Sequence, residues 1–131
     1  MANAALNALP KSDPAPYLSK AFLALWEKSY PTALRFYYKA RARTGYESDL
    51  IVGIIRFFSG VIDQHKERGD LRFGLAFVND WFFDREAAKE EYERFLQETR
   101  GSQASGLNAL HEHARIRLRE MKNEERNEHD L

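Results

Sequence analysis

Cysteine is absent from this sequence of 131 residues. Its absence excludes disulfide bonds, thiolate nucleophiles and cysteine-ligated zinc or iron–sulfur sites. A chain without disulfides is typical of a reducing compartment. The first residues, Met1 to Leu9, lack the basic and long apolar parts of a signal peptide, and no apolar run approaches the ~20 residues of a membrane span. We therefore expect a cytoplasmic protein that has no membrane contact.

A net charge of one sign is also lacking, because 20 basic residues balance 20 acidic ones. Zero net charge excludes a uniformly basic nucleic-acid-binding protein, but it leaves room for a local patch. Such a patch lies between Tyr30 and Tyr46, where four cations and no acid give +4 − 0 = +4. The rest of the chain then sums to −4, which is the one strong charge asymmetry of the sequence.

The signatures of common enzymes and cofactor sites are missing as well. The glycines fit neither a P-loop nor a nucleophile elbow, and no H-E-x-x-H or E-x-x-H pattern occurs. His111 and His113 lie about 200° apart around a helix and cannot share a metal ion, so we expect solvent-exposed or boundary histidines, as for His65 and His129. Asp80, Asp84 and Glu91 are expected along a solvated edge. We predict a protein that is not an enzyme and binds no metal or cofactor.

Apolar residues recur at three- and four-residue spacings, which predicts an all-α protein, a compact bundle of five or six helices. Asp13-Pro14 and Ser29-Pro31 are helix starts, and Gly45 and Gly69 are helix ends. Asp84 either starts a fifth helix or lies within a continuous one. The most apolar segments predict a central third and fourth helix, at about residues 48–66 and 70–83.

Four regions follow from the composition along the chain. Residues 1–12 are rich in small side chains and are expected to be flexible; residues 13–100 form the bundle core, and 101–106 a linker. Residues 107–131 form an amphipathic C-terminal helix, with a frayed tail from Asn123. Its apolar stripe folds back on the core, dimerises or docks on a partner, and the sequence leaves these three alternatives open.

A basic row on the second helix is the leading candidate for a binding surface. Arg35, Lys39 and Arg43 are four residues apart and form one row, Arg41 lies off that row, and Tyr46 is an aromatic neighbour. Such rows bind phosphate backbones, to which aromatic side chains add base stacking. The alternative is an ordinary solvated helix face whose cations pair with acids from elsewhere in the fold.

A second candidate surface is apolar and would bind a protein partner. The fourth helix is apolar nearly all round, which indicates that it is either central or half covered by a partner. The predicted contact residues on this helix and on the C-terminal helix are Phe73, Phe77, Trp81, Leu110, Leu118 and Met121.

One stretch resembles the small helical subunit of type III CRISPR effector complexes. It comprises Leu34-Arg-Phe-Tyr-Tyr-Lys-Ala40, an apolar helix, and Leu71-Arg-Phe73 before an aromatic-rich helix, about 45 residues in all. The resemblance implies a helical bundle that lines a nucleic-acid duplex with basic side chains. We therefore predict a non-catalytic subunit that contacts RNA or DNA backbone within a larger nucleoprotein assembly. The alternative is a protein–protein adaptor or inhibitor of the phage or mobile-element type, which acts through its aromatic helix faces.

Overall fold

The computed structural model describes residues 13–129, with side chains as far as Asn127, so the predictions for residues 1–12, for the side chain of His129 and for the last two residues lie outside it. Within this range the protein is all-α, as predicted. The helices are α2 (Ala15–Trp26), α3 (Tyr30–Arg41), α4 (Ser48–Gln64), a 3-10 turn η1 (Gly69–Leu71), α5 (Arg72–Phe82), α6 (Arg85–Glu98) and α7 (Leu107–His129).

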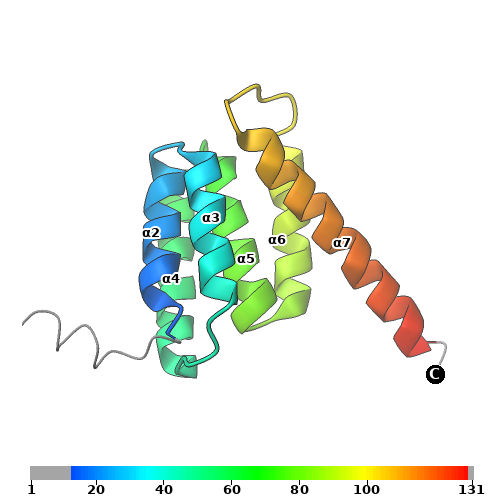
Figure 1. Ribbon diagram of the computed structural model, residues 1–131. Helices are drawn as coiled ribbons and strands as arrows, with labels where there is room; N and C mark the ends of the chain where they lie inside the picture. The colour runs from blue at the N-terminus through cyan, green and yellow to red at the C-terminus, as the bar shows by residue number, and fades with distance from the viewer. Residues whose placement is uncertain (1–12, 130–131) are drawn as a thin grey trace, which may run out of the picture.

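Helix α5 lies at the centre of the bundle, as its composition predicts. Figure 1 shows it between the α2–α3 pair on one side and α6 on the other. Nine of its eleven residues are buried, and its aromatic side chains Phe73 and Phe77 pack against Tyr37 of α3. Gly74 admits this close packing, since a Cβ atom there would lie 2.6 Å from the Tyr37 hydroxyl oxygen.

The prediction of a central α4 is wrong. Only Ile51, Phe58 and Ile62 of this helix are buried, and they form one edge that packs on α5 and α2. Other apolar residues of α4, such as Ile54 and Val61, are only half-buried, and Leu50 and Phe57 are 45% and 64% exposed. The prediction failed because a helix that is apolar all round is expected at the centre of a fold, whereas one side of α4 stays uncovered in this chain.

Asp84 starts a new helix, which settles the choice between one long helix and two. Its side chain accepts hydrogen bonds from the backbone N–H groups of Glu86 and Ala87 at the start of α6. These bonds satisfy two of the donors that a helix start leaves without partners. Helices α5 and α6 therefore form an antiparallel pair, and α6 returns along the core.

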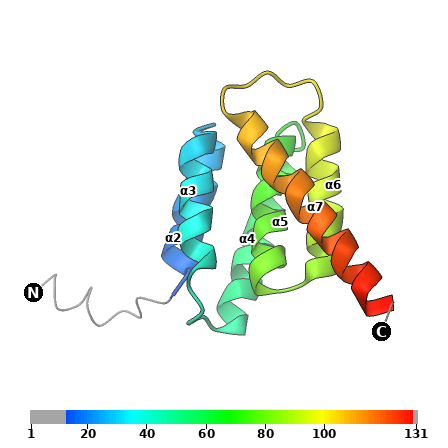
Figure 2. The ribbon, with the colours of Figure 1, turned by 45° about the vertical axis from the view of Figure 1, so that its right-hand side comes forward.

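Helix α7 folds back on the bundle and contacts α3 and α6. Figure 2 shows it running in front of α5 and α6. Leu107, Leu110, Ala114 and Met121 of its stripe are buried, and Leu118 is half-buried. The expected fraying from Asn123 is wrong, because the helix continues to His129. Its polar end is held by ion pairs to α6, from Arg85 to Glu124 and from Lys89 to Glu125.

The connection before α7 is fixed at its second end. Gly106 has a φ of +81°, and a Cβ atom there would lie 2.7 Å from the Cδ atom of Pro31. Gly101 has the same φ, but open space surrounds it. The loop therefore turns at both glycines and is seated on the start of α3 at Gly106.

The predicted partner-binding residues are mostly core residues. Phe73, Phe77 and Leu110 are fully buried, and Met121 is 3% exposed. Trp81 and Leu118 are half-buried. The aromatic face of α5 is covered by α3, α6 and α7 of the same chain, because the stripe of α7 folds back rather than projecting outward.

Candidate nucleic-acid interface

Helices α2 and α3 contain no acidic residue, and Glu27, in the turn that joins them, is the one acid of the hairpin. Neither Ala15–Trp26 nor Tyr30–Arg41 includes Asp or Glu, while the two helices carry Lys20, Arg35, Lys39 and Arg41. The hairpin forms one outer side of the molecule (Figure 1). The two helices supply no acid to neutralise their cations, so the positive potential along them extends into solvent.

Two aromatic rings hold the cations of the basic row against the hairpin. The Nζ atom of Lys20 lies 5.8 Å from the centre of the Tyr17 ring and 6.0 Å from that of Phe36. The Nζ atom of Lys39 lies 5.9 Å from the Phe36 ring, and the Cζ atom of Arg43 lies 4.9 Å from the Tyr17 ring. Such contacts stabilise a cation by about 0.5 to 1 kcal/mol at exposed sites.

We name this surface the cation–aromatic face; its residues are Tyr17, Lys20, Arg35, Phe36, Lys39 and Arg43. Arg35 belongs to it because it lies one turn before Lys39, about 6 Å along the helix. Lys20 extends the row predicted from the sequence onto a second helix. The sequence held no signal for this residue, because its nearness to Phe36 arises only when α2 and α3 pair.

The described residues do not pair the exposed cations of this face with acids. Lys20, Arg35 and Lys39 make no ion pair within residues 13–127, and Arg35 donates only to the hydroxyl of Thr32. Arg43 donates a hydrogen bond to the Tyr17 hydroxyl. Arg35 and Lys39 of the predicted row therefore lack the acidic partners that the alternative expected, and both lie on an exposed helix face.

Two predicted nucleic-acid-binding residues lie away from the cation–aromatic face. The guanidinium of Arg41 stacks over Tyr38, 4.2 Å from the ring centre, and lines a groove of about 390 Å³ between α3 and α7. The same groove includes Glu112 and Glu120, which oppose its positive charge. The ring of Tyr46 packs edge-on against Phe82 at the far end of α5. The structure therefore splits the +4 segment into separate surfaces.

A buried polar cluster lies beneath the groove between α3 and α7, and no sequence pattern predicts it. Arg117 of α7 makes two hydrogen bonds of 2.8 Å to the carboxylate of Asp80, and the Tyr92 hydroxyl donates a third of 3.0 Å. The side chain of Asp80 is fully buried, and the ion pair holds the pKa of Arg117 above its usual range. The expected solvated edge is wrong for Asp80, which is buried, and for Glu91, which is half-buried and pairs with Arg72. Asp84 is exposed and caps α6.

His113 belongs to this cluster and is buried, contrary to the expectation for the histidines. Its ring nitrogens lie 3.2 Å from the Tyr38 hydroxyl and 3.5 Å from the Tyr92 hydroxyl. Burial lowers the pKa of His113 to about 4, so the ring is neutral at pH 7. The hydrogen bonds of Asp80 to Tyr92 and Arg117 link α5 to α6 and α7. Because the Asp80 side chain is fully buried and accepts three hydrogen bonds, its carboxylate is not accessible as a base.

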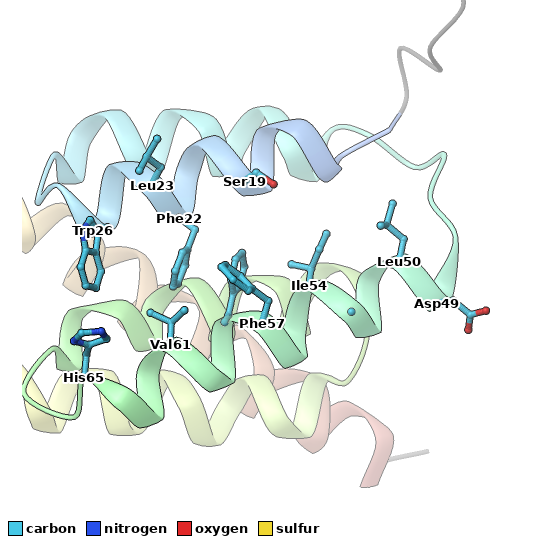
Figure 3. A pocket seen from close by; sticks show the side chains of 12 residues that line it. Ser19, Phe22, Leu23, Trp26, Asp49, Leu50, Ile54, Phe57, Val61 and His65 are labelled. Carbon is cyan, nitrogen blue, oxygen red and sulfur yellow. The ribbon is translucent and has the colours of Figure 1, made fainter.

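A groove of about 610 Å³ lies between α2 and α4 and is lined mainly by apolar side chains. Figure 3 shows Phe22, Leu23 and Trp26 on one side of it and Ile54, Phe57 and Val61 on the other. Leu23 and Trp26 are 56% and 40% exposed. An exposed apolar patch of this kind is typical of a protein–protein contact.

A metal site and a membrane-spanning helix are both absent from the part of the chain that the structure describes. Residues 13–127 contain no group of three or more His, Asp or Glu side chains placed to hold a metal ion. Within the described helices, none has the length and apolarity to cross a bilayer.

Comparison with family models, curated proteins and solved structures finds no match to this chain. The resemblance to CRISPR small subunits therefore remains an expectation from residues 34–40 and 71–73 alone.

Proposed function

We propose that this protein is a non-catalytic binding subunit that contacts the phosphate backbone of RNA or DNA with its cation–aromatic face. The observation that carries the proposal is the set of exposed cations Lys20, Arg35 and Lys39, which make no ion pair within residues 13–127 and lie on two paired helices without acidic residues. A polyanion gains most from such a surface, because each phosphate contact releases condensed counterions.

The geometry favours backbone contact over base stacking. The rings of Tyr17 and Phe36 are half-buried between α2 and α3, and cations already lie near their faces. These rings orient the cations and leave little ring surface for bases. We therefore expect weak sequence preference, since phosphate contacts position a protein but do not read bases.

Assembly with other subunits and a cytoplasmic location are part of this proposal. One face with a few cations gives modest affinity, so stable binding requires further contacts from partner subunits. The lack of cysteine agrees with a reducing compartment.

The test is fluorescence anisotropy with single-stranded and duplex RNA and DNA across a salt series. If each of the four cations of the cation–aromatic face contacts one phosphate, the slope of log K against log salt is about −2.8 for single strands and about −3.6 for duplex DNA. Affinity should then fall roughly 50- to 150-fold between 50 and 200 mM salt. The variant Lys20→Glu/Arg35→Glu/Lys39→Glu should lose binding and keep its helicity.

A charge-matched control separates this face from net charge. Lys66→Glu/Arg94→Glu/Arg119→Glu changes the total charge equally, at exposed positions in the turn after α4, on α6 and on α7. The proposal predicts nearly normal binding by this control. Equal losses in both triple variants, or no binding by the wild type at low salt, would contradict it.

A second function, protein–protein adaptor, is supported by the apolar groove between α2 and α4 rather than by the predicted aromatic face of α5. Leu23, Trp26 and Phe57 remain exposed there, whereas Phe73 and Phe77 are buried. Binding to an apolar partner should respond little to salt, which distinguishes the two functions.

A further inference from the structure

Helix α4 carries an exposed seam at the mouth of the apolar groove. The seam consists of Leu50, Gly53, Phe57, Gly60 and Gln64, all exposed, with spacings that alternate between three and four residues. This alternation is the pattern by which a second helix packs alongside in a coiled coil. Phe57 and Leu50 are 64% and 45% exposed.

Packing within the described chain does not require glycine at either Gly53 or Gly60 of the seam. A Cβ atom at Gly53 or Gly60 would meet nothing within 4 Å, although glycine destabilises a helix relative to alanine. Glycine is favoured where another backbone must approach closely. Both positions are open to a helix from another molecule, and they lie two turns apart on the same side of α4.

Charged residues of opposite sign border the seam on the side away from the groove. Arg56 and Asp63 are exposed and seven residues apart, and neither makes an ion pair within residues 13–127. The groove side of the seam is instead apolar, with Ile54 and Val61 half-buried there. The seam is therefore apolar on one flank and charged on the other.

We propose that the occupant of this seam is α4 of a second copy of the same chain, antiparallel and related by a two-fold axis. In the register that seats Phe57 on Gly60 of the second copy, heptad geometry sets Ile54 beside Val61 on the groove side. The same register sets Arg56 beside Asp63 on the opposite side. Each of these pairs occurs twice, because a two-fold interface is self-complementary.

The charges select this register. The neighbouring antiparallel register would seat Phe57 on Gly53 of the second copy, set Arg56 beside Arg56, and set Asp49 beside Asp63. Those contacts are all between like charges, which destabilise an interface. Charge complementarity therefore favours the pairing of Phe57 with Gly60.

The available area agrees with a dimer. The exposed parts of Leu23, Trp26, Leu50 and Phe57 amount to on the order of 400 Å² of apolar surface per copy. That is about half of the ~800 Å² per partner that a stable interface buries. The polar borders of α2 and α4 supply the remainder, so that these two helices from each copy form a four-helix bundle.

The test is sedimentation equilibrium of the full chain. The wild type should dimerise. Arg56→Asp and Asp63→Arg should each raise the dimer dissociation constant at least about tenfold, because both turn two attractive pairs into repulsive ones. Mixed in equal amounts, the two variants should form a heterodimer, and the double swap Arg56→Asp/Asp63→Arg should restore the homodimer.

A variant that fills the seam with a larger side chain tests the dimer independently of the charges. Gly60→Gln fills the seam without a clash in the monomer, so it should retain the fold and abolish the dimer. A wild type that stays monomeric at high concentration, or a dimer that none of these variants weakens, would overturn the proposal. Nucleic-acid binding by the hairpin does not use this seam, so either proposal can fail without the other.

Discussion

Arg117 and Asp80 form a buried, two-bond ion pair that joins the C-terminal helix to the centre of the bundle. Both hydrogen bonds measure 2.8 Å, and the side chains are 7% and 0% exposed. The pair comes from residues 37 apart in the sequence. It makes α7 part of the domain rather than an appended arm.

Asp80→Asn should destabilise the protein by about 3 kcal/mol or more, because it leaves the Arg117 charge without its main buried partner. Arg117→Met should have a cost of similar size, since it leaves the Asp80 carboxylate buried without its cation. The double variant Asp80→Asn/Arg117→Met should cost less than the sum of the two. Urea unfolding of all four proteins measures this coupling, and additive losses would contradict the pairing.

Acid should unfold the protein partly through His113. Burial lowers its pKa to about 4, below the ~6.5 of the unfolded chain. The unfolded state therefore binds more protons between these values, so the contribution is complete above pH 6.5 and is lost as the pH falls to about 4. The expected loss is about 3 kcal/mol.

The comparison that isolates this histidine is with His113→Gln. The stability difference between wild type and variant should shrink by about 3 kcal/mol from pH 7 to pH 4. His111, whose pKa burial also lowers, is present in both proteins, so its contribution cancels. A difference that is constant across this range would show that His113 is not buried as a neutral ring.

Gly106→Ala should cost more stability than Gly101→Ala. Both residues have a φ of +81°, which costs an alanine roughly 1 to 2 kcal/mol. Only Gly106 lies against Pro31, so its variant should lose at least about 1 kcal/mol more. Thermal unfolding of the two variants gives the answer, and equal losses would mean that the loop is not seated on α3.

Leu110→Ala should destabilise the domain by about 2 to 5 kcal/mol, because this side chain is fully buried where α7 packs on the core. Ile116 lies on the same helix but is 41% exposed, and Ile116→Ala should cost less than about 1 kcal/mol. A single cooperative transition in both variants would confirm that α7 unfolds with the bundle. A separate early transition of α7 would contradict it.

The sequence by itself determined the secondary structure of this protein. Helix starts such as Asp13-Pro14, breaks such as Ser29 to Pro31, and three- and four-residue apolar spacings are local features, so their physical effect can be read within one helix turn. The basic row of Arg35 and Lys39 was predictable for the same reason, since residues four apart share a helix face.

Only the tertiary structure decided which faces are covered. Periodicity cannot distinguish an apolar stripe that packs inside the chain, as at Leu110, from one that stays exposed, as at Phe57. The Asp80–Arg117 pair, the arrival of Lys20 beside Phe36 and the placement of Arg41 in another groove depend on contacts between distant segments. Such contacts follow from how helices pack as a set, and no single helix encodes them.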